Sequence, residues 1–194
     1  MCRKRKKGML VVLSAPSGCG KDTVFHELLK RRDDIVKSVS ATTRAPREGE
    51  VEGVSYYFKT EEEFKRLMNS QGLLEHTVYN GCYYGTPVEG VEKAINDGKI
   101  CFLIIEVEGG QNIMRLRPDC VPIFLLPPSM EVLRERLIKR QTNDEDDINR
   151  RLALAEFELS FADVYKYNVI NDDLEIAVNK INEILDIELI AHNR

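Results

Sequence analysis

The 194-residue sequence lacks several features that would assign it to a specialised class. No apolar run approaches the roughly 18 residues that a membrane-spanning helix needs, so we expect no membrane partner. The net charge is only −4, which argues against a protein that mainly holds nucleic-acid backbone. There is no internal repeat and no low-complexity linker. The length and the hydrophobic fraction of 43% fit one globular domain with a full core.

Cysteine and histidine are too scattered to indicate a disulfide framework or a metal site. The five cysteines are an odd number without a C-x-x-C pair, and the three histidines have no metal-ligand spacing. We therefore expect reduced thiols and a cytoplasmic protein. Basic residues 3–7 precede a short apolar run, as in a signal peptide. Cleavage after that run would damage the loop described below, so we interpret residues 3–7 as a solvated tail.

What the sequence does contain is an alternation of short apolar runs and helical patterns. We predict strands at residues 9–14, 100–107, 121–126 and 167–170, and helices at residues 24–32, 129–140 and from about 174. Strands that alternate with helices predict an α/β fold with a parallel, doubly wound sheet.

Two stretches interrupt this alternation. Residues 40–88 are polar, aromatic and rich in turn residues, with a strand-like piece at 55–58 and a short helical pattern at 61–68. Residues 140–150 are highly charged and carry almost no apolar side chains, so we expect them to lie outside the core. We interpret both stretches as insertions. The core is then expected to consist of residues 8–39, 89–139 and 151–194.

The strongest motif lies between the first predicted strand and the next helix. It consists of Ala15, Pro16, Ser17, Gly18, Cys19, Gly20, Lys21, Asp22 and Thr23. Glycines let successive backbone N–H groups curl around phosphate oxygens, and the helix N-terminus adds positive charge. Lys21 would reach the β- and γ-phosphates of a nucleotide. Ala15 and Asp22 depart from the pattern G-x-x-x-x-G-K-[ST], and a chance glycine-rich turn is the alternative, which the flanking strand and helix disfavour.

A second candidate site follows in the first insertion. Arg44 and Arg47 are three residues apart, with Pro46 between them. Guanidinium groups bind phosphate through two parallel hydrogen bonds. The pair therefore suits an oxyanion, and a solvated basic turn is the alternative.

With these residues the sequence resembles the guanylate kinases. The string S-x-S-x-T-T-R-x-P-R-x-G-E-x-x-G-x-x-Y-x-F, which begins at Ser38, is specific to that family, and the resemblance covers essentially residues 9–185. It implies a P-loop nucleoside monophosphate kinase with a GMP-binding domain at 40–88 and an ATP lid at 140–150. It also implies transfer of the γ-phosphoryl group of ATP to GMP, with Mg²⁺ accompanying the ATP.

The family's binding roles can be carried over by position. Arg44, Arg47, Tyr56 and Tyr84 would hold the GMP phosphate, and Ser40, Glu75 and Thr86 would read the guanine. The Glu75 carboxylate can accept both the N1–H and the N2 amino group of guanine, whereas the unprotonated N1 of adenine would repel it. The Thr86 hydroxyl can donate to O6. We expect Glu50 to orient the neighbouring arginines.

The implied reaction needs no general base, because the acceptor phosphate has a second pKa of about 6. Catalysis would come from positioning and charge neutralisation. The family pattern implies this role for Lys21, Arg136, Arg140 and Arg151, an adenine contact for Asn171, and water-mediated contacts to Mg²⁺ for Glu106 and Thr23. The segment of residues 104–109 departs from the family pattern at two positions. Ile104 stands where an acidic residue is usual, and Glu108 is an additional acid.

Two alternative functions remain open. One is a non-catalytic guanylate-kinase-like interaction module that binds peptides. Such modules typically lose the phosphate-loop lysine and the lid arginines, whereas Lys21, Arg136 and Arg140 are present. The other is a P-loop kinase for a different small phosphate, which Glu75 and Thr86 disfavour.

Overall fold

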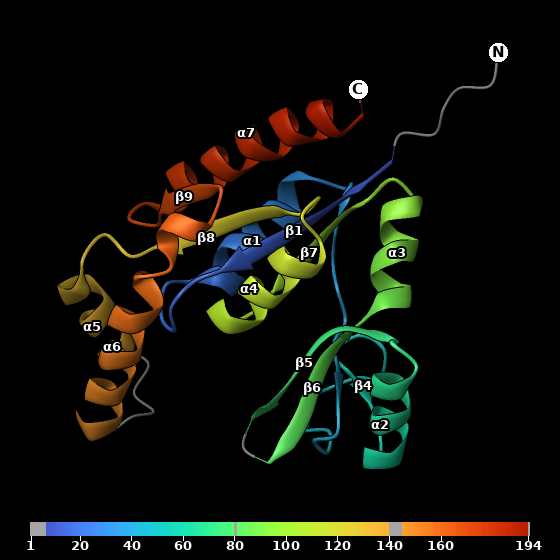
Figure 1. The fold of residues 1–194 in the computed structure, drawn as a ribbon. Helices are drawn as coiled ribbons and strands as arrows, with labels where there is room; N and C mark the ends of the chain where they lie inside the picture. Colours follow the sequence, from blue (N-terminus) through green and yellow to red (C-terminus); the bar gives the residue numbers. More distant parts are fainter. Residues whose placement is uncertain (1–6, 80, 140–144, 194) are drawn as a thin grey trace.

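The computed structural model describes residues 7–79, 81–139 and 145–193 of the chain, and these form two sheets (Figure 1). The larger sheet has five parallel strands in the order β2-β7-β1-β8-β9. They are β1 (Met9–Ser14), β2 (Ile35–Lys37), β7 (Ile100–Ile104), β8 (Val121–Leu126) and β9 (Tyr167–Ile170). The predicted α/β fold with a parallel central sheet is confirmed.

Helices cover both faces of this sheet. On the central strand β1, Met9, Val11 and Leu13 belong to one hydrophobic cluster, and Leu10 and Val12 belong to the other. The first cluster includes side chains of α1 (Lys21–Arg31), α5 (Met130–Lys139), α6 (Glu145–Leu159) and α7 (Leu174–His192). The second includes side chains of α3 (Val88–Asn96) and α4 (Val107–Leu116). Side chains alternate between the faces of a strand, so a continuous apolar run is buried on both.

Most element boundaries follow local signals. The Asp173 side chain accepts a hydrogen bond from the Ile176 N–H at 3.0 Å and so caps α7. The strand predicted at 100–107 ends at Ile104, because Glu106 is already the N-cap residue of α4. The helix predicted from residue 24 begins at Lys21, directly after the left-handed Gly20. A short 3₁₀ helix, η1 (Ala162–Val164), follows α6.

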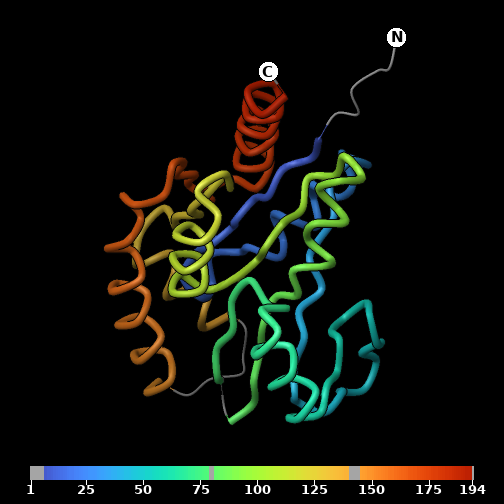
Figure 2. Tube along the Cα trace, turned by 45° about the vertical axis from the view of Figure 1, so that its right-hand side comes forward, coloured from blue at the N-terminus to red at the C-terminus, as the bar shows by residue number. Residues whose placement is uncertain are grey.

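A second sheet is formed within residues 41–87, in the order β4-β3-β6-β5. Its elements are β3 (Ala41–Thr42), β4 (Tyr57–Phe58), α2 (Glu61–Asn69), β5 (Leu73–Tyr79) and β6 (Cys82–Pro87). A reciprocal capping box between Thr60 and Glu63 starts α2. Figures 1 and 2 both show this sheet and the N-terminal end of α6 projecting away from α7.

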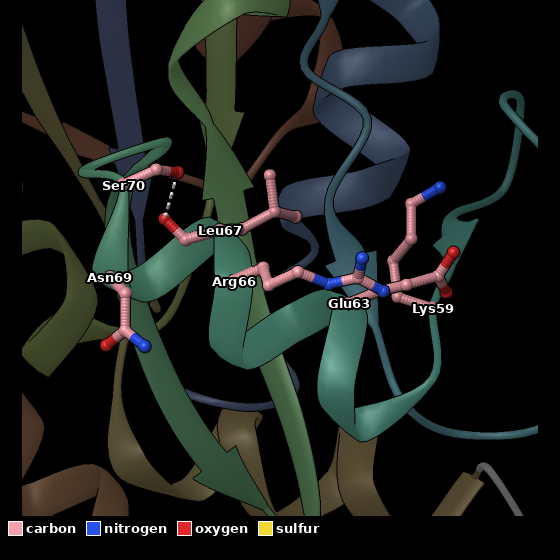
Figure 3. A pocket seen from close by; sticks show the side chains of 6 residues that line it. All are labelled: Lys59, Glu63, Arg66, Leu67, Asn69 and Ser70. Atoms are coloured by element: carbon pink, nitrogen blue, oxygen red, sulfur yellow. Dashed lines mark hydrogen bonds between the residues drawn. The ribbon is translucent and has the colours of Figure 1, made fainter.

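The helix α2 packs on one face of this second sheet. The buried Phe64 of α2 stacks on Tyr83, with ring centroids 5.3 Å apart. Because side chains alternate along a strand, Tyr84 and Thr86 point to the opposite face. A wide groove on α2 is lined by Lys59, Glu63, Arg66, Leu67, Asn69 and Ser70 (Figure 3).

The segment at 140–150 differs in part from its expected form. Residues 140–144, including Arg140, lie outside the described residues. Residues 145–150 are the first turns of α6, which continues without a break to Leu159. Ile148 within them is buried, with 7% of its surface exposed. One helix therefore joins the charged segment to the core.

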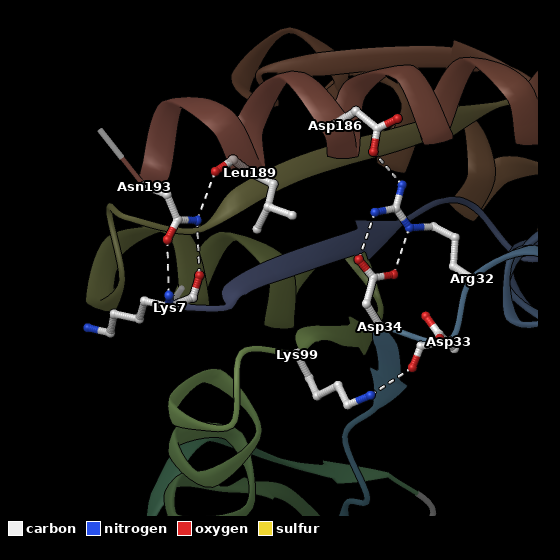
Figure 4. A network of polar contacts seen from close by, with 8 residues as sticks. All are labelled: Lys7, Arg32, Asp33, Asp34, Lys99, Asp186, Leu189 and Asn193. Carbon is white, nitrogen blue, oxygen red and sulfur yellow. Dashed lines mark hydrogen bonds and ion pairs between the residues drawn. The ribbon is translucent and has the colours of Figure 1, made fainter. Parts of the chain in front are cut away.

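A polar network holds the two ends of the described chain together (Figure 4). The Asn193 side chain accepts from the Lys7 N–H at 3.0 Å and donates to the Lys7 carbonyl at 3.1 Å. The Arg32 guanidinium binds both oxygens of Asp34 at 2.8 Å and reaches Asp186 of α7 at 2.6 Å. These contacts tie the C-terminal half of α7 to the segments that precede β1 and follow α1.

Candidate active site

The loop between β1 and α1 is wrapped tightly against its neighbours. Gly18 and Gly20 have φ angles of 93° and 90°, a region that favours glycine. A Cβ atom on Gly18 would lie 3.0 Å from the side chains of Leu133 and Leu137, and one on Gly20 would lie 2.8 Å from Asn171 Nδ2. Both glycines are therefore required by backbone conformation and by space. The loop has the form that a phosphate-binding turn needs.

Lys21 folds back over this loop. Its Nζ donates to the Ala15 carbonyl at 2.7 Å and lies 3.2 Å from Glu106 Oε1. The Lys21 side chain is only 10% exposed, whereas that of Glu106 is 67% exposed. A small cavity of about 140 Å³ is lined by Pro16, Ser17, Gly18, Gly20, Lys21, Asp22, Thr23 and Glu106. Seven of the nine predicted loop residues and Glu106 thus line one cavity, whereas Ala15 and Cys19 are buried in the core.

Asp22 is exposed and lies beside a lysine. Its side chain is 71% exposed, and Oδ1 lies 3.7 Å from Nζ of Lys37, the last residue of β2. Sequence reasoning did not single out Lys37, because β2 is a three-residue strand with only two apolar positions. A lysine facing the carboxylate offsets part of the negative charge that Asp22 brings to a phosphate site.

Asn171 and Arg136 support the loop from behind. Asn171 follows β9 and is buried, and its Nδ2 donates to the Cys19 carbonyl at 2.8 Å. An Arg136 guanidinium nitrogen donates to the Asn171 carbonyl at 2.8 Å. Burial raises the pKa of the Cys19 thiol to about 12, so this cysteine is a packing residue. In this structure Asn171 holds the loop, a role that the sequence did not indicate.

Arg44, Tyr56 and Tyr84 come together on the second sheet. Arg44 makes two hydrogen bonds to the Glu50 carboxylate, at 2.8 and 3.0 Å. The Arg44 guanidinium lies 5.4 Å from the centre of the Tyr56 ring, and the Tyr56 and Tyr84 rings meet edge to face at 6.1 Å. Tyr84 also interacts electrostatically with Arg44.

Glu50 organises both arginines, as the sequence led us to expect. Besides pairing with the Arg44 side chain, its Oε2 accepts the backbone N–H of Arg47 at 2.8 Å. The hydrogen bond from Arg44 is the main reason that the pKa of the Glu50 carboxyl is lowered. The Arg47 side chain is exposed. The cluster therefore presents positive charge and hydroxyl groups toward solvent, which suits a phosphate.

Glu75 and Thr86 form a second pair on the same sheet. The Thr86 hydroxyl donates to Glu75 Oε1 at 2.7 Å, and Thr86 is only 1% exposed. Burial raises the pKa of Glu75, and the hydrogen bond from Thr86 opposes that shift. Ser40 directly precedes β3, whose Ala41 pairs with Gly85, the residue before Thr86.

The first turn of α4 closes one side of this pair. A Cβ atom on Gly109 would lie 3.7 Å from Glu75 Oε2, so the absence of a side chain there leaves room beside the carboxylate. Ile104, at the end of β7, packs against the hydrophobic core. That packing accounts for an apolar residue at a position where the family usually has an acid.

Arg151, another of the predicted arginines, lies on α6 and pairs with Asp147 of the same helix, with Nε 3.1 Å from Oδ2. Arg134 on α5, which sequence reasoning passed over, reaches Glu145 on α6 at 3.2 Å. The Arg134–Glu145 ion pair therefore links the two helices. The predicted Arg140 lies outside the described residues.

Comparison with known proteins identifies the family. The family model described as guanylate kinase matches residues 7–188. The chain belongs to the guanylate kinase family. It is 48% identical to the guanylate kinase of Shouchella clausii over 185 residues, which cover 95% of this chain and 90% of that protein. A guanylate kinase structure from Anaplasma phagocytophilum is 39% identical and superposes with a TM-score of 0.73, covering 95% of this chain and 88% of the other.

A more distant structure shares only the fold. The SH3-kinase fragment of tight junction protein 3 is 10% identical and has a TM-score of 0.51, with 96% of this chain and 60% of that chain covered. Among residues 7–79, 81–139 and 145–193, no helix is long and apolar enough to cross a membrane. The same residues contain no group of three or more His, Cys, Asp or Glu side chains that could hold a metal ion.

Proposed function

We propose that this protein transfers the γ-phosphoryl group of ATP to GMP and releases ADP and GDP. The observation that carries the proposal is the Glu75–Thr86 hydrogen bond of 2.7 Å. It fixes an acceptor-only carboxylate on the face of the second sheet opposite α2, where a base stacked beside Tyr84 would meet it. Guanine offers the N1–H and the N2 amino group to such a carboxylate, and adenine has no equivalent N1–H.

The structure refines the role expected of Thr86. Its hydroxyl proton is already donated to Glu75, so in the free protein Thr86 orients the carboxylate. A hydroxyl group rotates to suit its partners, and donation to guanine O6 would follow only after Glu75 receives the two N–H groups of the base. Ser40, which directly precedes β3, is part of the same proposed base site.

The phosphate of GMP would bind at the arginine cluster. Arg44 is held by Glu50 with its guanidinium beside Tyr56 and Tyr84. Arg47 is exposed and tethered through its backbone to the same carboxylate. Two guanidinium groups and two phenol hydroxyls supply the donors that a phosphate dianion needs. We propose that Arg44, Arg47, Tyr56 and Tyr84 hold this group.

ATP would bind with its phosphates in the loop of residues 15–23. Backbone N–H groups and Lys21 would neutralise the transferring phosphoryl group, and Arg136, Arg140 and Arg151 would add charge from the α5–α6 side. Asn171 would lie behind the loop, toward the base. Positioning and charge are sufficient, because the GMP phosphate is itself the nucleophile.

A divalent cation fits this site. The loop cavity is lined by Thr23 and Glu106, whose hydroxyl and carboxylate oxygens are hard donors of the kind that Mg²⁺ prefers. We propose that Thr23 and Glu106 hold Mg²⁺ through water. When bound, the ion neutralises negative charge on the β- and γ-phosphates.

We also assign a role to each region of the chain and a cellular location to the protein. Residues 8–39, 89–139 and 151–194 would form the core, residues 40–88 the GMP-binding region, and residues 140–150 the lid over ATP. The described cysteines are free thiols, which supports a cytoplasmic location.

The decisive experiment is a coupled assay of ADP release with GMP, AMP, UMP and dTMP as acceptors. We expect GMP to be used with by far the highest kcat/KM. Preference for another acceptor would support a different P-loop kinase. Release of ADP with none of the four would support a non-catalytic module.

A further inference from the structure

Asn171, directly after β9, is held by three hydrogen bonds to three different elements. Its backbone N–H donates to the Leu126 carbonyl at the end of β8, and its own carbonyl accepts from the Arg136 guanidinium of α5, both at 2.8 Å. Its side-chain Nδ2 donates to the Cys19 carbonyl, also at 2.8 Å. Only 6% of the residue is exposed. A strand, a helix and the phosphate loop therefore fix this one side chain.

The parallel sheet explains why this asparagine meets the phosphate loop. The strand order places β8 between β9 and β1, and the carboxyl ends of parallel strands lie at the same edge of a sheet. The loop leaves β1 at the edge where Asn171 leaves β9. A Cβ atom on Gly20 would lie only 2.8 Å from Asn171 Nδ2, so the loop can approach this closely because position 20 has no side chain.

The hydrogen bond to Cys19 sets the direction of one peptide group in the loop. In a trans peptide, the C=O of one residue and the N–H of the next point in opposite directions. The Cys19 carbonyl points to Asn171, on the buried side of the loop, so the Gly20 N–H points to the other side. There Gly20 and Lys21 line the loop cavity. Asn171 thus turns a backbone donor toward the space in which we place the ATP phosphates.

We propose that Asn171 is a positioning residue for the ATP phosphates, which acts by holding the Cys19 carbonyl and so aiming the Gly20 N–H into the loop cavity. The inference rests on the proposed function, because it places the ATP phosphates in this loop. Asn171 acts through the loop backbone, so its contribution does not depend on the base of the nucleotide. A direct contact to adenine, which the family resemblance implies, would make that contribution depend on the base.

Inorganic tripolyphosphate has no base and therefore separates the two roles. The Kd of ATP is measured by calorimetry without GMP, and the Kd of tripolyphosphate by its displacement of ATP, so that only binding at the ATP site is counted. Asn171→Leu nearly retains the shape of the side chain but cannot donate to Cys19. Asn168→Leu makes the same change at an exposed position on β9 and is the matched control.

We expect Asn171→Leu to raise both Kd values by the same factor, about tenfold or more, because a buried carbonyl loses its donor. Asn168→Leu should match wild type. A rise confined to ATP would overturn the inference, since it would show that Asn171 reads the base. It would also be overturned by unchanged Kd values, or by tripolyphosphate failing to displace ATP from wild type.

Steady-state kinetics separates positioning from general loosening of the protein. In Asn171→Leu the kcat/KM for ATP should fall by about tenfold or more. The kcat should contribute to that fall, because a backbone donor also acts on the charge that develops during transfer. The KM for GMP should stay within twofold of wild type. An equal rise in the KM values for ATP and GMP would contradict the inference.

NMR of the wild-type protein provides a test that needs no variant. Tripolyphosphate should shift the Gly20 amide and the Asn171 side-chain amide, and ATP should shift both in the same direction. A shift of the Asn171 amide with ATP but not with tripolyphosphate would refute the inference even if Asn171→Leu does not fold. Wild-type transfer to GMP is measured first. Its absence would count against the proposed function, whereas binding of ATP and tripolyphosphate would still test the role of Asn171.

Discussion

The phosphate loop and the Arg44 cluster both offer positive charge to a phosphate, but they are built in different ways. The loop is a backbone structure whose shape is fixed by glycines packed against Leu133, Leu137 and Asn171. The Arg44 cluster consists of side chains on two short strands and a turn, and Glu50 holds it together. The loop lies against the main core, whereas the cluster lies on the smaller sheet, on the face opposite α2.

This difference predicts how each site responds to change. Backbone donors in a rigid loop favour the charge that develops during transfer, so their loss should appear mainly in kcat. Side chains that bind the unreacting phosphate or the base stabilise ground state and transition state alike, so their loss should appear mainly in KM for one substrate. The four predictions below test that division, in order of expected size.

The largest effect is expected for Lys21→Met. Its ammonium group, 2.7 Å from the Ala15 carbonyl, would act on the transferring phosphoryl group, so kcat should fall by about 10²- to 10³-fold. The KM for GMP should stay near wild type. Lys30→Met on the exposed face of the same helix is the matched control and should be fully active. A change in KM for GMP without a fall in kcat would contradict the division.

The contrast between the two sites also explains what could be predicted from sequence. The phosphate loop is a local motif between a continuous apolar run and a helix, so its position and the role of its glycines could be predicted from the sequence. Glu50 lies six residues from Arg44 and was also predicted as its partner. By contrast, β3 has only two residues, and its ladder is completed by Tyr84 and Gly85 of β6. No local sequence pattern predicts a strand of two residues.

Two contacts at the phosphate loop that were missed from sequence join different elements of the chain. Asn171 reaches Cys19, and Lys37 reaches Asp22. Each depends on the strand order of the parallel sheet, which periodicity does not give. The burial of Glu158 was missed as well, although Glu158 lies three residues after the buried Ala155 and so on the inner side of α6.

Arg44→Ala is expected to have the next largest effect. Without the guanidinium group the phosphate of GMP loses a bidentate, charge-assisted contact, and the KM for GMP should rise by roughly tenfold to a hundredfold. ATP affinity should change little. Arg66→Ala on α2, which faces the opposite side of the second sheet, is the control. Loss of ATP binding in Arg44→Ala would mean that the two nucleotide sites are interchanged in our assignment.

Glu75→Gln should reduce the preference for GMP over AMP. The amide can accept only part of the guanine donor pair, or it presents its own donor to guanine, and such a mismatch costs about 1–3 kcal/mol. The GMP/AMP ratio of kcat/KM should therefore fall by about tenfold or more. An unchanged ratio would show that Glu75 does not read the base.

The pH dependence of the same pair gives an independent check. Only the ionised Glu75 can accept both N–H groups, and burial raises its pKa. The kcat/KM for GMP should therefore fall as the pH is lowered through that raised pKa, at a higher pH than for an exposed carboxyl group. The GMP phosphate titrates as well, with a second pKa of about 6, but it does so equally with both proteins. The kcat/KM of wild type for GMP, divided by that of Glu75→Gln at the same pH, thus isolates the contribution of Glu75. A ratio that does not change with pH would contradict this role of Glu75.

The smallest effect concerns Asp22, where the phosphate-loop pattern has Ser or Thr. Its carboxylate is 71% exposed and 3.7 Å from Lys37 Nζ, which supports the view that it turns away from the metal. On this view Asp22→Ser removes a negative charge near ATP, and ATP affinity should rise by about two- to fivefold, the range of an exposed charge interaction. Activity should be kept or slightly raised.

Lys37 makes this last prediction sharper. If the lysine offsets Asp22, Lys37→Met alone should weaken ATP binding by a similar factor, and the double variant should return toward the affinity of Asp22→Ser, because the uncompensated carboxylate is gone. A magnesium titration of kcat separates this view from direct coordination. If Asp22 coordinates the ion directly, the Asp22→Ser variant will need several times more Mg²⁺ for half-maximal activity, and its kcat will be lower. Both effects will then be the same with Lys or Met at position 37. That result would reverse the assignment and would make the loop site, like the Arg44 cluster, dependent on a side-chain carboxylate.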